Sequence, residues 1–119
     1  MHRDKPKYWI IKYSPEIGER KSPHDYINNS AQRASLYLRL RTIEKIKIVR
    51  EWPGCKPFLH NSLRFYQLTI GRHRVYIYLD TRDKRNHAIV CHVCPKVSQK
   101  AKKKDLDRAT NHIRKYLQE

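Results

Sequence analysis

The chain has 119 residues, the size of a single domain (residues 1–119) with one modest core, and 27 Lys and Arg against 11 Asp and Glu give it a formal net charge of +16 at pH 7. So basic a surface is typical of a protein that binds nucleic acid, an anionic membrane or an acidic protein. No apolar stretch approaches the roughly 20 residues that span a bilayer, and the run at residues 8–11 is too short for a signal peptide. Three cysteines without disulfide-framework spacing predict reduced thiols and a cytoplasmic protein.

The N-terminal part of the chain predicts a strand followed by a short helix. Residues 7–13 alternate between two faces, as a strand does. Ser22 is a suitable N-cap and Pro23 occupies the favoured first helical position. The polar residues 28–30 then interrupt this helix.

A second, longer helix is predicted over residues 31–52, because Pro53 and Gly54 end it. Leu36, Leu40 and Ile43 follow helical spacing, but the later apolar residues drift around the axis. We therefore expect a bend, or burial on two sides. Residues 55–62 are predicted to be a connecting loop.

The next segments predict a three-stranded antiparallel meander. Residues 65–70 and 73–80 alternate with period two and are rich in aromatic and β-branched residues. Gly71 suits the first position of a tight type II′ turn between them. Residues 88–94 form the third run, after a polar turn.

The two faces of this meander differ in character. One face carries Val75, Ile77 and Leu79, which must be buried against the two early helices. The other face carries basic, aromatic and polar side chains, namely Gln67, Thr69, Arg74, Tyr76 and Tyr78. We expect this second face to be open, as a concave platform for an RNA backbone and stacked bases.

The last element is a helix over residues 102–117, with Leu106, Ala109, Ile113 and Leu117 on one stripe. The lysines at residues 100–104 oppose the helix dipole, and this unfavourable placement suggests a polyanion partner. The predicted order is β-α-α-β-β-β-α. We expect an α+β fold with an antiparallel sheet of about four strands, in which the first strand lies beside the last.

Three stretches resemble the RelE/ParE superfamily of bacterial toxins. Residues 62–79, SLRFYQLTIGRHRVYIYL, resemble its hairpin, which reads SLYELR-(I/V)G-x-(Y/F)RV-x-Y. Residues 89–109, IVCHVCPKVSQKAKKKDLDRA, resemble the H-x-F-x-KKSQKTPKKEIE-x-A segment of its HigB-like, phage-associated branch. Lys21, Ser22 and Pro23 are similar to the G-K-S-P that opens the family's first helix.

The resemblance implies a RelE-like fold, with two N-terminal helices packed on one face of the sheet and a C-terminal helix. It implies the toxin of a type II toxin–antitoxin pair: a metal-independent endoribonuclease that cuts mRNA, with the ribosome as a partner, and blocks translation. The ribose 2′-OH would attack the adjacent phosphate and leave a cyclic phosphate, without a cofactor. The partner implied is an antitoxin with a helix-turn-helix. Two alternatives stay open: a ParE-like inhibitor of DNA gyrase, and a catalytically inactive nucleic-acid-binding module.

The resemblance also assigns the phosphate-binding residues. Arg74 stands at the arginine that holds the scissile phosphate, and Lys96 stands at the first basic residue of the KKS motif. Val97 replaces the second basic residue, and Lys100 could substitute for it. The basic residues expected to contact RNA are Lys56, Arg64, Arg72, Lys100, Lys102, Lys103 and Lys104.

The general base is left open among four residues. Histidine is the natural choice, because its pKa lies near neutrality. His60 lies in the predicted loop, where some family members place a catalytic histidine, and His92 must share the face of Arg74 to compete. His73 is Arg74's neighbour and points to the other face. Tyr76 is a further candidate as proton carrier or stacking partner.

Cys91 and Cys94, with His87 nearby, suggest a zinc site, but the pattern is incomplete. Structural zinc commonly uses two such pairs, and this chain has one. Thiols three residues apart on a strand are expected to point to opposite faces. We therefore expect these cysteines to fill the core, and no metal.

Overall fold

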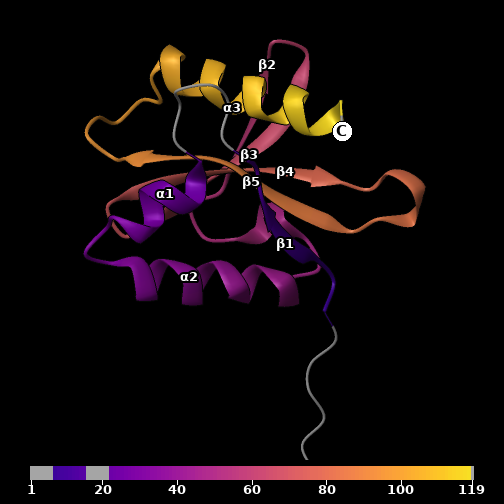
Figure 1. Cartoon of the computed structure of the whole chain (residues 1–119), viewed down its shortest axis with the longest axis horizontal. Helices are drawn as coiled ribbons and strands as arrows, with labels where there is room; N and C mark the ends of the chain where they lie inside the picture. The colour runs from indigo at the N-terminus through magenta and orange to yellow at the C-terminus, as the bar shows by residue number, and fades with distance from the viewer. Residues whose placement is uncertain (1–6, 16–21, 119) are drawn as a thin grey trace, which may run out of the picture.

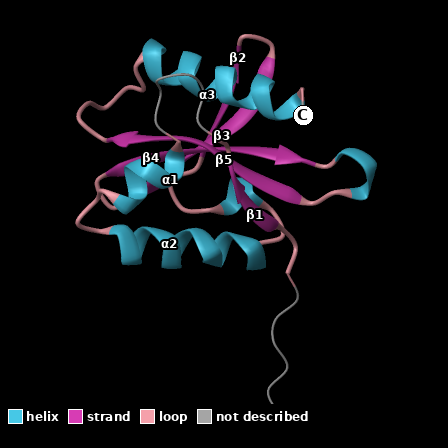
Figure 2. Cartoon of the chain, in the orientation of Figure 1, coloured by secondary structure: helices cyan, strands magenta, loops and turns pink. Residues whose placement is uncertain are grey.

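A five-stranded mixed sheet runs through the middle of the molecule, with helices on both of its faces (Figure 1 and Figure 2). The computed structural model describes residues 7–15 and 22–118. Its strands are β1 (Ile10–Tyr13), β2 (Lys56–His60), β3 (Leu63–Ile70), β4 (His73–Asp80) and β5 (His87–Pro95). They lie in the order β1-β5-β4-β3-β2, and β1 is parallel to β5 while the other pairs are antiparallel. The predicted α+β class and the place of the first strand beside the last are confirmed.

The helices form one layer on each side of the sheet. They are α1 (Pro23–Asn28), α2 (Arg33–Thr42) and α3 (Lys103–Leu117). Figure 1 shows α2 on one side of the sheet and α3 on the other. Among the described residues, no helix has the length and apolar character needed to cross a bilayer.

The N-cap predicted at Ser22 is confirmed. Its hydroxyl accepts a hydrogen bond from the backbone N–H of Asp25, and the Asp25 carboxylate accepts one from the Ser22 N–H, each over 3.3 Å. This reciprocal pair is a capping box, which satisfies two backbone donors of the first turn. Lys21, the first residue of the K-S-P resemblance, lies outside the described residues.

The prediction of one helix over residues 31–52 is wrong beyond Thr42. The chain continues as two short 3₁₀ turns, Ile43–Lys45 and Val49–Glu51. Four β-branched residues fall within residues 43–49, and such residues weaken a helix. The change of direction lets Ile43 and Val49 both enter the core, where they are at most 1% exposed. This accounts for the apolar stripe that drifts around the helical axis.

The loop predicted at residues 55–62 is also wrong, because β2 occupies most of it and raises the strand count from about four to five. Asn61 and Ser62 turn the chain into β3 with φ of 49° and 65°, the left-handed conformation that both central residues of a type I′ hairpin take. Pro57 is tolerated because β2 is an edge strand, where one row of backbone groups needs no partner.

The sheet face that was expected to be open is covered by α3. Phe65, Tyr76, Ala109 and Ile113 form a cluster in which each is at most 1% exposed. On the same face, Arg74 is only 3% exposed. The amphipathic stripe of α3 needs an apolar surface, and the aromatic rings of β3 and β4 supply one. The predicted open RNA platform is therefore wrong, and most of this face is core.

A β-bulge in β5 places both strand cysteines on the α3 side. Tyr76 pairs with His92 while Ile77 pairs with Val90, which leaves Cys91 as an extra residue. An extra residue breaks the alternation of side chains. Cys91 and Cys94 consequently join one cluster, and the expectation that they point to opposite faces is wrong.

Asp80 anchors the end of α3 to the end of β4. It is fully buried and accepts hydrogen bonds from the Arg82 backbone N–H and guanidinium over 3.0 to 3.1 Å, and one from the Tyr116 hydroxyl. The Arg82 guanidinium, then the Tyr116 hydroxyl, hold the pKa of Asp80 well below its ordinary value near 3.8. The carboxylate is therefore more stable in the folded chain than in the unfolded chain.

We predict that Asp80→Asn lowers the free energy of unfolding at pH 7 by about 2 kcal/mol, because hydrogen bonds to a charged group are lost. The pKa of Asp80 is depressed by folding, so its contribution is present above about pH 4 and is lost as the pH falls toward the folded pKa. Urea unfolding from pH 7 to pH 3 should show a weaker pH dependence in Asp80→Asn than in the wild type. Asp83→Asn, an exposed neighbour, should keep the wild-type dependence; an equal loss in both variants would contradict the assignment.

Candidate nucleic-acid interface

A pocket of about 660 Å³ opens at the end of the sheet where β3 ends and β4 begins. Its lining residues come from four segments of the chain: Pro53, Gly54, Lys56, Gln67, Thr69, Arg74, Lys96, Gln99 and Lys100. Four of them are Lys or Arg, and none of the described residues that line it is acidic. We call it the basic pocket. Such a site favours an anion.

Arg74 forms the inner wall of the basic pocket. Its Nη1 donates to the carbonyl oxygen of Lys100 over 3.2 Å, and its Nη2 donates to the carbonyl oxygen of Ser98. Its buried Nε has no partner among the described residues. The guanidinium therefore holds the segment after β5 in place. A bidentate phosphate contact through both terminal nitrogens would require that segment to move.

The lysines of the basic pocket are held by an ordered backbone. The Lys96 N–H donates to the carbonyl oxygen of Arg72 over 2.8 Å, which fixes the chain as it leaves β5. The Ser98 hydroxyl donates to the Lys100 carbonyl over 2.7 Å. The side chains of Lys56, Lys96 and Lys100 are exposed, so their ammonium groups are available to a ligand.

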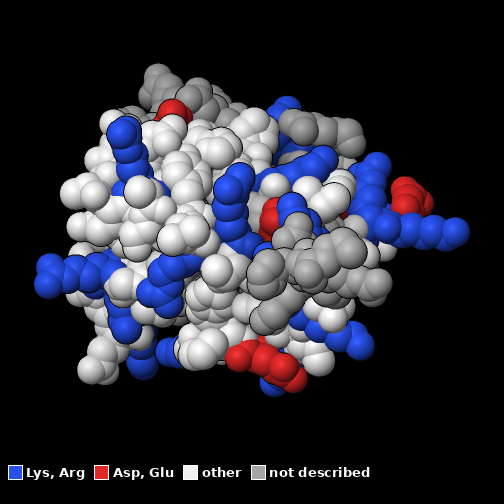
Figure 3. Space-filling model, turned by 90° about the horizontal axis from the view of Figure 1, so that it is seen from below, with Lys and Arg blue, Asp and Glu red and all other residues white. Residues whose placement is uncertain are grey.

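The other predicted RNA contacts lie outside the basic pocket. Arg72 is exposed in the turn between β3 and β4, and Lys102, Lys103 and Lys104 are exposed where α3 begins. Arg64 lines a different pocket, beside Trp9 and Tyr78. The surface that carries α2 also displays scattered lysine and arginine side chains (Figure 3). The basic field thus extends well beyond the basic pocket.

The structure does not bring the candidate histidine bases into the basic pocket. His60 Nε2 lies 2.7 Å from Oδ1 of Asp107 on α3, and this hydrogen bond lowers the pKa of Asp107. His92 shares the sheet face of Arg74, as it must to act as the base, but its Nε2 is 2.9 Å from Oδ1 of Asp105. Neither histidine is among the lining residues.

Tyr76 reaches the basic pocket only through another side chain. The ring is fully buried, and its hydroxyl donates to Oε1 of Gln67 over 3.0 Å. Gln67 lines the basic pocket. Burial, with smaller contributions from Cys94 and Asp105, holds the pKa of Tyr76 well above its ordinary value. Tyr76 therefore positions Gln67 and is a poor base at neutral pH.

His73 lies on the other side of the sheet, as predicted. Its Nδ1 is 2.9 Å from the hydroxyl of Tyr26 in α1, and its Nε2 is 3.2 Å from Gln32. Partial burial lowers the pKa of His73. These contacts link the hairpin to α1.

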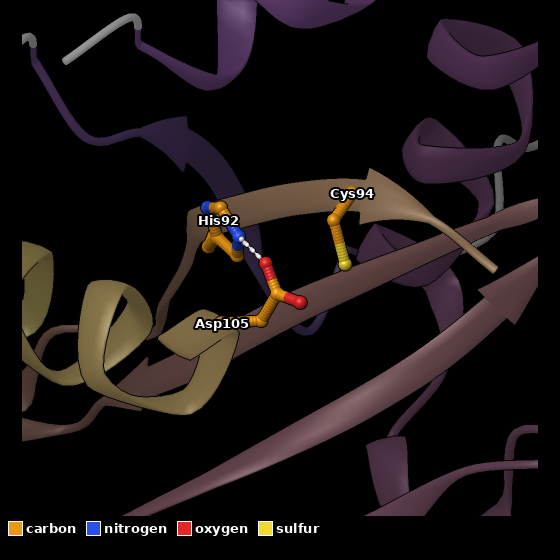
Figure 4. A group of neighbouring side chains, drawn as sticks. All are labelled: His92, Cys94 and Asp105. Atoms are coloured by element: carbon orange, nitrogen blue, oxygen red, sulfur yellow. Dashed lines mark hydrogen bonds and ion pairs between the residues drawn. The ribbon is translucent and has the colours of Figure 1, made fainter. Parts of the chain in front are cut away.

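Three side chains with metal-ligating atoms form a cluster that the sequence pattern did not predict. His92 and Cys94 come from β5 and Asp105 from α3, and one nitrogen, sulfur or oxygen atom of each lies within 4.8 Å of the others (Figure 4). Burial, then the Asp105 carboxylate, raise the pKa of Cys94 to about 11, although Arg74 opposes this. The signal available was the two-residue spacing of His92 and Cys94, which keeps two side chains on one face of a strand.

Comparison with protein-family models, with curated proteins and with solved structures finds no match to the chain. The resemblance to the RelE/ParE superfamily stays a prediction from the short motifs at residues 21–23, 62–79 and 89–109. The function of this chain is therefore inferred from those motifs and from the chemistry of the basic pocket.

Proposed function

We propose that this chain is a RelE-like toxin that binds mRNA in the basic pocket, cleaves it during translation and so blocks protein synthesis. The observation that carries the proposal is the meeting of Arg74, Lys96 and Lys100 in one pocket without an acidic lining residue. The resemblance assigns Arg74 and Lys96 to the phosphate, and Lys100 is the expected substitute for the second basic residue of the motif, which is Val97 here. Several cations in one pocket are best suited to a ligand that carries several phosphates, such as RNA.

In the proposed reaction, the ribose 2′-OH attacks the adjacent phosphorus and the bond from phosphorus to the 5′ oxygen breaks. The 2′ proton passes to a base, and the leaving 5′ oxygen takes up a proton. Negative charge grows on the phosphate oxygens in the transition state, and Arg74 with Lys96 and Lys100 stabilises it. The products are a 2′,3′-cyclic phosphate and a 5′-hydroxyl, and no metal ion takes part in these steps.

A second candidate function is binding without cleavage, as in a ParE-like gyrase inhibitor or an inactive module. It is favoured by one observation: among the described residues that line the basic pocket there is no histidine and no carboxylate. Cleavage then requires a lysine of the pocket, or a group of the ribosome, to take the 2′ proton.

The two candidates are separated by induced expression, with mapping of mRNA 5′ ends and a gyrase supercoiling assay in parallel. RNA cleavage predicts new 5′-hydroxyl ends within reading frames and normal supercoiling. Gyrase inhibition predicts reduced supercoiling and no new 5′-hydroxyl ends in mRNA. Intact mRNA together with normal supercoiling would support the third alternative, an inactive nucleic-acid-binding module.

The proposed cellular partner is an antitoxin with a helix-turn-helix, whose acidic residues would cover the basic pocket. The net charge of +16 supports a partner of opposite charge. It would compete with RNA for the same lysines, so the complex should not bind RNA.

We predict a steep salt dependence of RNA binding. Four cations line the basic pocket, and four phosphate contacts to single-stranded RNA give a slope of log affinity against log salt of about −3. Fluorescence anisotropy with a short single-stranded RNA measures it. Lys96→Ala should reduce the steepness by about 0.7, whereas Lys47→Ala, an exposed lysine outside the pocket, should leave it unchanged. If RNA affinity did not change with salt concentration, the basic residues would not bind RNA phosphates, and the antitoxin would be their only partner.

A further inference from the structure

His92, Cys94 and Asp105 are placed as the ligands of a metal ion would be. We propose that these three side chains bind Zn²⁺ and thereby tie the start of α3 to the end of β5. The inference concerns a site distinct from the basic pocket, and it does not depend on RNA cleavage.

The backbone presents the three side chains to one point. His92 and Cys94 are two apart on β5, so they share the face that α3 covers. Asp105 enters from the first turn of α3, and its carboxylate lies between the imidazole and the thiol in Figure 4. Two elements that are joined by a loop thus supply one ligand set.

The separations are close to those of a tetrahedral zinc site. Zinc binds sulfur at about 2.3 Å and nitrogen or oxygen at about 2.0 to 2.2 Å, which places neighbouring ligand atoms about 3.3 to 3.6 Å apart. The His92–Asp105 contact is 2.9 Å, and the three ligand atoms lie within 4.8 Å of one another. To reach this geometry, side-chain rotations must open the His92–Asp105 contact by about 0.4 Å and close any wider separation by up to about 1 Å.

The ligand types select the metal. A thiolate, an imidazole and a carboxylate form the mixed sulfur, nitrogen and oxygen set that zinc accepts, whereas Mg²⁺ and Ca²⁺ prefer oxygen alone. As anions, Cys94 and Asp105 together neutralise a divalent cation. Burial and the Asp105 carboxylate raise the pKa of the Cys94 thiol, so Zn²⁺ would have to displace its proton. The Arg74 guanidinium opposes a nearby cation, and its two hydrogen bonds to backbone carbonyls offset part of its charge.

The site is buried but reachable. Cys94 and Asp105 are 6% and 7% exposed, while His92 lines a cavity of about 590 Å³ between α1 and α3. Of the three ligands only His92 lines that cavity, so an ion that enters through it would meet the imidazole first. Without the ion, His92 Nε2 and Asp105 Oδ1 form a hydrogen bond over 2.9 Å, which zinc would replace.

Zinc would fix both ends of residues 95–104, the segment that carries Lys96 and Lys100 of the basic pocket. The ligands Cys94 and Asp105 flank this segment directly. The ion would therefore restrain the lysines without touching them.

The test uses the purified full chain, stripped with a chelator, and Co²⁺ as a spectroscopic substitute for Zn²⁺. We expect one equivalent of Co²⁺ to produce a sulfur-to-cobalt charge-transfer band that Zn²⁺ removes. Cys94→Ser should abolish the band. Cys91→Ser is the matched control, since this thiol is also buried on the α3 side but donates to the Tyr76 carbonyl, and it should keep the band. Absence of the band in the wild type, or its loss in Cys91→Ser alone, would overturn the proposal.

A measurement on the wild type alone guards against a variant that fails to fold. X-ray absorption of the zinc-loaded chain should show one sulfur at about 2.3 Å and nitrogen or oxygen ligands at about 2.0 to 2.2 Å. A shell without sulfur, or with two sulfurs, would exclude the site. Asp105→Asn and His92→Gln should each weaken zinc affinity at least tenfold, by calorimetry.

Discussion

Replacing Ile113 by alanine is expected to lower the free energy of unfolding by about 3 kcal/mol, a large part of the total for a domain of this size. Ile113 is fully buried in α3, in the cluster that contains Phe65 and Tyr76. Truncation removes buried methyl and methylene groups and leaves a cavity between the helix and the sheet. The rigid aromatic rings around it cannot collapse fully into that space.

Urea unfolding at pH 7 measures the effect, and Ile48→Ala is the matched control. Ile48 is 50% exposed, so its truncation should change the free energy of unfolding by less than about 0.5 kcal/mol. Equal effects of the two substitutions would mean that α3 is not packed on the sheet in solution. The face with Arg74 and Tyr76 would then be open, as its sequence pattern first suggested.

The elements that could be predicted from sequence are those with a strong local signal. The alternating runs at residues 65–70 and 73–80 lie within β3 and β4, and Gly71 takes the positive φ of 59° that the predicted tight turn needs. The serine and proline that open α1 are a local capping signal. The amphipathic stripe of α3 likewise predicts its limits to within one residue.

The errors have a common physical cause: they depend on contacts between distant segments. Strand β2 reads as a loop because its five residues include Pro57 and gain their pairing only from β3. The helical spacing of residues 36–43 continues past Thr42, but packing of Ile43 and Val49 into the core ends the helix. Helical periodicity shows that α3 has an apolar face and does not show which sheet face it covers.

The residues of the candidate site also divide into those with a local sequence signal and those brought together only by the fold. The motif indicated Arg74 and Lys96, with Lys100 as a substitute for the missing second basic residue, and all three line one pocket. The cluster of His92, Cys94 and Asp105 was missed because Asp105 belongs to another element and the bulge at Cys91 has no sequence signature. Tertiary geometry, which local patterns do not encode, selects those partners.

Arg74→Ala is expected to abolish growth arrest on induction, and to lower affinity for single-stranded RNA at least tenfold. The substitution removes a cation from the wall of the basic pocket. It also releases the carbonyls of Ser98 and Lys100, so Lys96 and Lys100 are no longer held beside the sheet. Loss of these two charge-assisted hydrogen bonds should cost about 2 kcal/mol of stability, which a folded domain tolerates.

Three further variants separate the roles of Arg74. Arg74→Lys keeps the charge, but its single ammonium group cannot replace both guanidinium nitrogens that bind the Ser98 and Lys100 carbonyls. Its RNA affinity should therefore lie between those of the wild type and Arg74→Ala. A double change of the exposed Lys96 and Lys100 to alanine removes charge without disturbing the core, and it should also stop growth arrest. Arg33→Ala, which removes one exposed charge from α2 on the other side of the sheet, should leave growth arrest and RNA affinity unchanged.

The outcomes distinguish the residues. If Arg74→Ala, shown to be folded by its urea transition, still arrests growth while the double lysine variant does not, the lysines bind RNA without Arg74. If all four variants arrest growth as the wild type does, the basic pocket is not the toxic site, and the scattered charge on the α2 side becomes the next surface to test.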